Sequence, residues 1–113
     1  MECIFCQIVA GKAPSEIIYQ DEEIVAFRDI NPQSPVHLLI IPKKHIPSLA
    51  HLSETELHMM GHIVNTANQL AKRDGIAESG YRLAINCGDE GGQLVPHLHM
   101  HLLGGRRLSG VLG

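Results

Sequence analysis

The 113-residue chain contains no tryptophan, only two phenylalanines and two tyrosines, and no long apolar run. A membrane helix needs roughly 20 consecutive apolar residues, so the sequence predicts no membrane partner. Basic residues are also few, with nine Lys and Arg against twelve Asp and Glu. A general nucleic-acid binder needs a basic surface to displace counterions, so we expect no nucleic-acid partner either.

The chain has the usual length of one domain, and its apolar content of 44% is enough to form a core. Because aromatic residues are few, aliphatic side chains must fill most of that core. We therefore expect a single domain over residues 1–113. The acidic start Met1-Glu2 and the lack of a long apolar segment do not resemble a signal peptide, which predicts the cytoplasm. In that compartment the three cysteines are expected to be free thiols or metal ligands.

Hydrophobic periodicity predicts two helices and five strands. A Ser53–Glu56 capping box and apolar residues at helical spacing predict one long helix that ends at Asp74-Gly75. The run at 37–41 is apolar apart from His37, as expected of a strand buried on both faces. We expect an α+β fold, in which an antiparallel sheet of about five strands accompanies one long and one short helix. The remaining elements are a short helix at 3–10 and strands at 16–20, 24–28, 81–87 and 98–103.

Histidine is the abundant residue, with eight copies, and three of them alternate with apolar residues near the C-terminus. His97, His99 and His101 would share one face of the last strand, about 7 Å apart. The other face, formed by Leu98, Met100 and Leu102, would then pack against the long helix.

Three interpretations of this histidine face compete. It is an inert polar face, a zinc site that uses His-x-His, or a nucleophilic centre. A neutral imidazole is the form that attacks phosphorus, and a second imidazole can protonate the leaving group. Gly91-Gly92 favours this third interpretation, because glycines allow main-chain N–H groups to approach phosphate oxygens.

The segment 86–106, together with 37–46, 26–30 and Ile4-Phe5, closely resembles the histidine triad (HIT) family, and specifically its Hint branch. The resemblance implies a homodimer with a continuous sheet, paired through the helix and a strand. It implies hydrolysis of purine nucleoside phosphoramidates or related adenylylated compounds through a covalent nucleotidyl-histidine, with no cofactor required for catalysis. The substrate would be a purine nucleotide of the AMP or GMP type.

The resemblance also assigns roles to individual residues. His99 would be the nucleophile, His101 would contact the phosphate and leaving group, and His97 and His37 would be supporting groups. Leu94 stands where many Hint proteins have a serine, so leaving-group protonation must come from elsewhere. The implied nucleotide ligands are Asp29 for the ribose, Asn86, Gln93 and Val95 around the phosphate, and Ile4, Phe5, Ile8, Phe27 and Ile30 around the base.

Cys3-Ile4-Phe5-Cys6 is a Cys-x-x-Cys pair, which forms half of many zinc sites but is also compatible with two small buried residues. By resemblance to some bacterial relatives, His45 and His97 would complete a structural zinc site. His58 and His62, at helical i, i+4 spacing, lack the Glu of a metalloprotease motif and are interpreted as exposed or dimer-facing residues.

Two other functions stay open at this point. One is a nucleotide-binding regulatory dimer with little turnover, and the other is a zinc-dependent hydrolase that uses the histidine strand as ligands.

Overall fold

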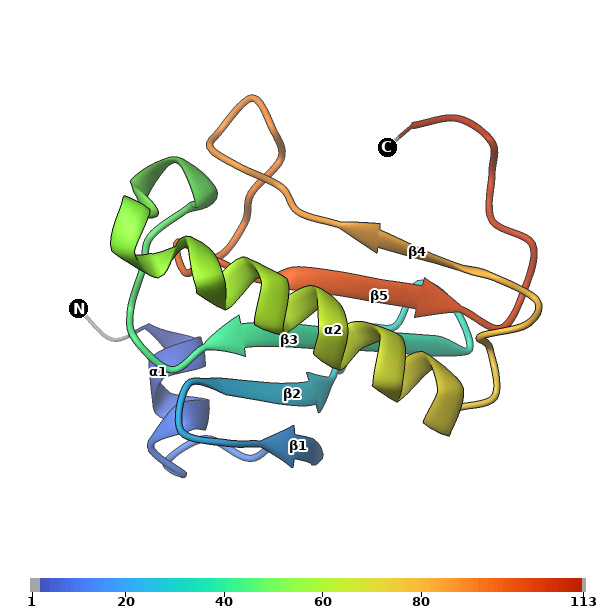
Figure 1. The fold of residues 1–113 in the computed structure, drawn as a ribbon, viewed down its shortest axis with the longest axis horizontal. Coiled ribbons are helices and arrows are strands. Elements are labelled where there is room, and N and C mark those ends of the chain that lie inside the picture. The colour runs from blue at the N-terminus through green and yellow to red at the C-terminus, as the bar shows by residue number, and fades with distance from the viewer. Residues whose placement is uncertain (1–2, 113) are drawn as a thin grey trace.

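The computed structural model describes residues 3–112, within which two α-helices and five strands are found. The strands form one antiparallel sheet in the order β1-β2-β3-β5-β4 (Figure 1). This confirms the predicted α+β class. The cytoplasm stays a prediction, and the Met1-Glu2 start on which it partly depends lies outside the described residues. The elements are α1 Ile4–Val9, β1 Ile17–Gln20, β2 Ile24–Arg28, β3 Val36–Pro42, α2 Leu57–Arg73, β4 Tyr81–Ala84 and β5 Met100–Gly104, with 3-10 turns at Leu49–His51 and Glu54–Glu56.

The central strands β2 and β3 bury side chains on both faces of the sheet. Ile24, Ala26, Leu38 and Ile40 share an apolar cluster with residues of the long helix α2, which crosses one face in Figure 1. The alternate residues of β2 and β3 form a second apolar cluster with α1: Phe5, Ile8, Val25, Phe27, Leu39 and Ile41. This follows from the period of two in a strand, and it confirms the prediction of a strand buried on both faces.

The helix α2 begins and ends as its sequence predicts. The Ser53 N–H donates to Glu56 Oε1 at 2.9 Å, although the first turn is a 3-10 turn and the α-helix itself starts at Leu57. Gly75 follows the helix with φ of 76°, a conformation that glycine adopts at little cost. No helix within residues 3–112 has the length and apolar character that crossing a bilayer requires.

The surface histidines of α2 contact the turn between β1 and β2. His58 Nε2 lies 2.8 Å from Glu23 Oε2, and His62 Nε2 lies 2.6 Å from Asp21 Oδ2. These two contacts hold the helix against the turn, a role that the sequence did not indicate.

Two predicted strand boundaries were wrong by two residues or more, and the others lie within one residue of the observed bounds. β4 ends at Ala84 rather than Cys87, and β5 begins at Met100 rather than Leu98. The last ladder pairs are Ala84 with His101 and Ile40 with Met100. Before them the Leu98 N–H leaves the ladder and donates to the Ile46 carbonyl oxygen at 2.7 Å. His97 and His99 therefore precede the strand, although Leu98, Met100 and Leu102 still lie in the apolar cluster of α2, as predicted.

Candidate active site

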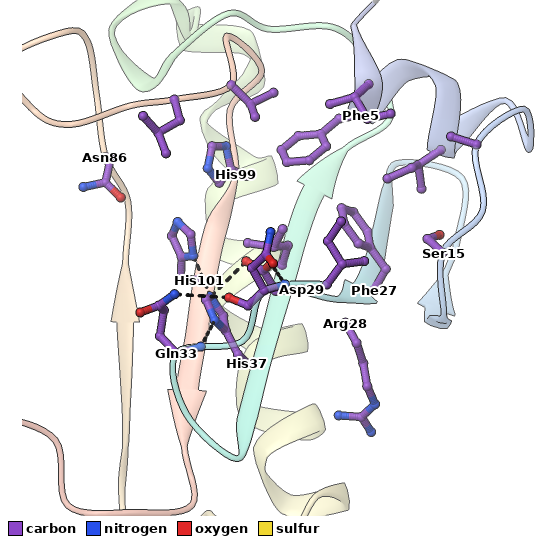
Figure 2. A pocket seen from close by; sticks show the side chains of 18 of the residues that line it. Phe5, Ser15, Phe27, Arg28, Asp29, Gln33, His37, Asn86, His99 and His101 are labelled. Carbon is purple, nitrogen blue, oxygen red and sulfur yellow. Dashed lines mark hydrogen bonds and ion pairs between the residues drawn. The ribbon is translucent and has the colours of Figure 1, made fainter.

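A cavity of about 690 Å³ lies on the α1 side of the sheet, between α1, the ends of β2 and β3, and the start of β5. Ligand pockets commonly have this size. We call it the histidine pocket, and Figure 2 shows the side chains around it. Eleven of the thirteen predicted catalytic and nucleotide-binding residues line it: Ile4, Phe5, Ile8, Phe27, Asp29, Ile30, His37, Asn86, Val95, His99 and His101.

Two predicted residues do not line the pocket. The Gln93 side-chain amide donates to the Pro47 and Val95 carbonyl oxygens, and its Oε1 accepts from the Gly88 N–H. These bonds make Gln93 a support for the loop beside the pocket. His97 has no exposed surface, and its ring lies toward the two cysteines of α1.

His99 lies in the pocket with one ring nitrogen fixed by the backbone. Its Nδ1 lies 2.7 Å from the His97 carbonyl oxygen, which can only accept, so Nδ1 carries the proton in neutral His99. Nε2 then holds a lone pair, and no hydrogen-bond partner for it is found within residues 3–112. The Phe5 ring packs edge-on at 5.1 Å between centroids, which restricts rotation of the imidazole. The arrangement suits a neutral nucleophile.

A chain of hydrogen bonds orients His101. The Gln33 N–H donates to His37 Nδ1 at 3.0 Å, so the proton of His37 is on Nε2. His37 Nε2 lies 2.9 Å from His101 Nδ1, which must therefore accept. His101 consequently carries its own proton on Nε2, the nitrogen left to serve a ligand. Burial and the neighbouring His99 and His37 lower the pKa of His101 to about 4, so the ring is neutral at pH 7.

This lowered pKa predicts a loss of stability in acid. The unfolded chain protonates His101 near pH 6.5 but the folded chain only near pH 4, so the unfolded state binds more protons between these values. The free energy of unfolding should therefore fall as the pH drops from 6.5 and reach its full loss, about 3 kcal/mol from this residue, below pH 4. Urea unfolding at pH 7 and pH 4 measures it. His101→Gln should lose less stability than the wild type over that interval, and equal losses would contradict the assignment.

Asp29 lies beside this histidine pair at the end of β2. Its Oδ1 accepts from the Asn31 N–H at 2.9 Å, while Oδ2 lies 3.4 Å from His37 Nε2. Burial lowers the pKa of His37, and the Asp29 carboxylate opposes that effect. Asp29 thus presents a partly exposed carboxylate to the pocket.

The glycine-rich loop at 88–92 differs from its predicted use. The Gly92 N–H donates to the Asp89 carbonyl oxygen and the Gln93 N–H to that of Gly88, both at 3.0 Å. The Gly92 amide is therefore used within the loop and is not free for phosphate, while the use of the Gly91 amide for phosphate stays a prediction. Asn86 Nδ2 donates to the Gly91 carbonyl oxygen. A Cβ at Gly91 would lie 2.2 Å from the Cys87 carbonyl oxygen, which is too close for any side chain. Glycine is needed here for a close turn.

Cys3, Cys6, His45 and His97 converge beneath the pocket wall; we call them the Cys/His cluster. The Sγ atoms lie 3.4 Å (Cys3) and 3.6 Å (Cys6) from His97 Nδ1, and Cys6 Sγ lies 3.2 Å from His45 Nδ1. Ligands of tetrahedral zinc are separated by about 3.5 Å, so the spacing fits that ion. His97 Nε2 donates to the Pro42 carbonyl oxygen at 2.8 Å, which leaves Nδ1 with the lone pair that a metal needs.

A second group, Asp29, His37 and His101, also lies close enough to share a metal ion. There, however, His37 Nδ1 accepts the Gln33 N–H, so the proton must stay on the nitrogen that faces the group. In the Cys/His cluster, His97 presents an unprotonated nitrogen to a metal. In the second group, His37 presents a protonated one.

The sequence analysis missed several residues that line the pocket, among them Ser15, Arg28 and Gln33. Arg28 forms ion pairs with Asp74 and Glu16 at 3.0 and 3.3 Å. Gln33 contributes its backbone N–H to His37, and the Pro-rich loop around it gave only a turn signal. No sequence signal marked Ser15, because its place depends on the loop after α1.

Comparison with known proteins agrees with this geometry. The family model described as scavenger mRNA decapping enzyme C-term binding matches residues 2–111. The purine nucleoside phosphoramidase of Escherichia coli K12 is 48% identical over 111 residues, covering 98% of this chain and 93% of that protein. A HIT family hydrolase from Legionella pneumophila Philadelphia 1 superposes with a TM-score of 0.94 at 45% identity, covering 96% and 97% of the two chains. The chain belongs to the histidine triad (HIT) family. Within that family it is a hydrolase.

Two further relatives bear on the Cys/His cluster. A maize protein named as a 14 kDa zinc-binding protein is 45% identical over 108 residues, covering 94% of this chain and 84% of that protein. A Zn-bound histidine triad family protein from Mycobacterium smegmatis superposes with a TM-score of 0.82 at 35% identity, covering 94% and 76% of the chains. Zinc is thus associated with similar proteins.

Proposed function

We propose that this protein hydrolyses purine nucleoside phosphoramidates in two steps, with the nucleotide bound covalently to His99 between them. The observation that carries the proposal is the tautomer of His99, whose Nδ1–H is held by the His97 carbonyl oxygen so that Nε2 is the nucleophile. The name of the E. coli relative supports the substrate class.

In the first step His99 Nε2 attacks phosphorus and the P–N bond of the substrate breaks. The anionic phosphoryl group opposes the burial that keeps His101 and His37 neutral, so this pair takes up one proton from solvent. His101 then transfers its Nε2 proton to the leaving nitrogen. The amine departs, the histidine pair is again neutral, and the nucleotide is bound to His99.

In the second step water attacks phosphorus and the bond to His99 breaks. The histidine pair accepts the proton that the water loses, and it returns this proton to solvent when the nucleoside monophosphate leaves. The sum is one phosphoramidate and one water converted to one nucleotide and one amine. Passing through His99 replaces direct attack by water with attack by a better nucleophile.

The rest of the pocket would position the nucleotide. Asp29 would accept the ribose hydroxyls through its partly exposed carboxylate. Phe5 and Phe27 pack edge-on at 5.5 Å between centroids and offer apolar surface to a purine. Ile4 and Ile30 form its exposed rim, at 46% and 84% exposure.

We also propose that the Cys/His cluster holds a structural zinc ion. Zinc bound there would join α1 to the loop that carries His45 and to the start of the triad segment, and it would supply no Lewis acid to the reaction. Cys3, Cys6, His45 and His97 would fill all four positions of a closed tetrahedral site, leaving His99 and His101 for the nucleotide.

A homodimer is proposed from the surfaces that the fold leaves open. β4 is the edge strand of the sheet beside β5, and α2 exposes Leu57 at 56% and Val64 at 38%. A second copy paired along β4 would continue the sheet and cover this face of α2. Sedimentation velocity should give about twice the chain mass, and a monomer at micromolar concentration would contradict the proposal.

Trapping the covalent intermediate tests the function directly. Mixing the protein with adenosine phosphoramidate and quenching in acid-free denaturant should yield one added adenylyl group per chain by mass spectrometry, on the peptide containing His99. A binding module with little turnover would give nucleotide retention without the adduct. The zinc hydrolase alternative would give chelator-sensitive turnover without it, although within residues 3–112 the three triad rings form no common ligand set.

A further inference from the structure

Ser15 carries a polar atom that the fold buries without a partner. Its Oγ exposes less than 1 Å², and within residues 3–112 it is the one buried side-chain oxygen or nitrogen that makes no hydrogen bond. A buried hydroxyl without a partner costs about 1–3 kcal/mol, so such groups are rare and call for a reason.

The position of Ser15 suggests that reason. Ser15 lines the histidine pocket with Ala13 and Pro14, at the end remote from the catalytic histidines. In Figure 2 the rings of Phe5 and Phe27 lie between His99 and Ser15. A nucleotide with its phosphorus at His99 and its ribose at Asp29 would therefore direct its base toward Ser15.

The backbone holds this segment in place from both sides. The Lys12 N–H donates to the Gln7 carbonyl oxygen at 2.8 Å, and the Arg28 N–H donates to that of Glu16 at 3.1 Å. The backbone is thus fixed on both sides of Ser15, between α1 and β2. The torsion of the Ser15 side chain can still change. Rotation about χ1 exchanges three staggered positions of Oγ and can turn the hydroxyl from the wall into the pocket.

We infer that Ser15 Oγ forms the hydrogen bond that recognises the polar edge of the purine base. The other side chains proposed for the base are apolar or aromatic: Ile4, Phe5, Ile8, Phe27 and Ile30. Such walls accept any flat ring, whereas a hydroxyl both donates and accepts and can serve a ring nitrogen or an exocyclic amino group. Ser15 therefore determines specificity for the base, and this inference rests on the proposed nucleotide function.

The test compares two ligands in calorimetric titrations of the full chain. AMP carries the base, while ribose 5-phosphate has the same sugar and phosphate without it. Ser15→Ala should weaken AMP binding about 3- to 10-fold, the value of one neutral hydrogen bond. Binding of ribose 5-phosphate should stay unchanged within about 2-fold, and Ser15→Thr, which keeps the hydroxyl, should retain most of the AMP affinity. Ser79→Ala, on the loop after α2, is the matched control and should leave both ligands unaffected.

A stability measurement separates recognition from structure. If the hydroxyl is kept for the base, Ser15→Ala removes an unpaired buried group and should unfold in urea at the same concentration as the wild type or higher. Unchanged AMP affinity in Ser15→Ala, or equal losses for both ligands, would overturn the inference while leaving the proposed function intact. A wild type that binds neither ligand would overturn both.

Discussion

Replacing His99 with alanine is expected to lower kcat/KM for adenosine phosphoramidate by about 10⁴-fold or more, the scale seen when an essential nucleophile is removed. The variant loses the only group proposed to bond to phosphorus, and His101 cannot substitute, because its Nδ1 accepts from His37 and its Nε2 carries a proton. The walls that bind the base and ribose stay, so nucleotide affinity should change little. Steady-state assays with titration of AMP measure both quantities.

The control for this experiment is His51→Ala. His51 is exposed and bonds to Ser48 away from the histidine pocket, so its loss should leave turnover unchanged. Substantial turnover in His99→Ala would refute the covalent route. Loss of turnover in the wild type on chelation, with the fold intact, would instead indicate metal-assisted chemistry.

Removal of zinc is expected to have the second large effect, on stability. Purified without chelator, the protein should contain about one zinc ion per chain, and Cys6→Ser should contain much less. If free zinc exceeds the dissociation constant 1,000-fold, the ion contributes about 4 kcal/mol to the free energy of unfolding. The Cys6→Ser variant should lose most of that contribution, measured by urea unfolding alongside zinc analysis.

Cys87→Ser serves as the matched control, because Cys87 lies outside the Cys/His cluster. It should keep the zinc content and the stability of the wild type. A wild-type protein that holds no zinc, even after zinc is added, would refute the site and favour an unmetallated pair of thiols. Turnover that persists in chelated, folded protein would show that the ion has only a structural role.

The strands that the sequence predicted well are those whose pattern is local. β2 was predicted at its observed bounds because its residues are apolar on both faces. Ile24 and Ala26 pack in one cluster, and Val25 and Phe27 pack in the other. The end of β4 and the start of β5 were missed because the pairing there depends on residues that are distant in sequence. Leu98 gives its N–H to Ile46, a residue far away in sequence, and no periodicity in the triad segment reveals that choice.

In the candidate site, too, features marked by a local sequence pattern were predicted, and features set by distant residues were not. The alternating histidines and their resemblance to the HIT family predicted the residues that the pocket brings together. The protonation state of each ring could not be predicted, because it is set by backbone groups such as the Gln33 N–H and the His97 carbonyl. Ser15 was missed since a lone serine in a loop carries no signal until the chain folds over it.

His97 contributes to two different sites, through its ring and through its carbonyl oxygen, which limits how its surroundings can change. Its ring belongs to the Cys/His cluster, whereas its carbonyl oxygen fixes the tautomer of His99. His97 and His99 are separated only by Leu98, so a shift of His97 displaces the carbonyl oxygen that fixes the proton of His99 on Nδ1. A homologue that dispensed with both thiols would need another rigid hold on this residue to keep its chemistry.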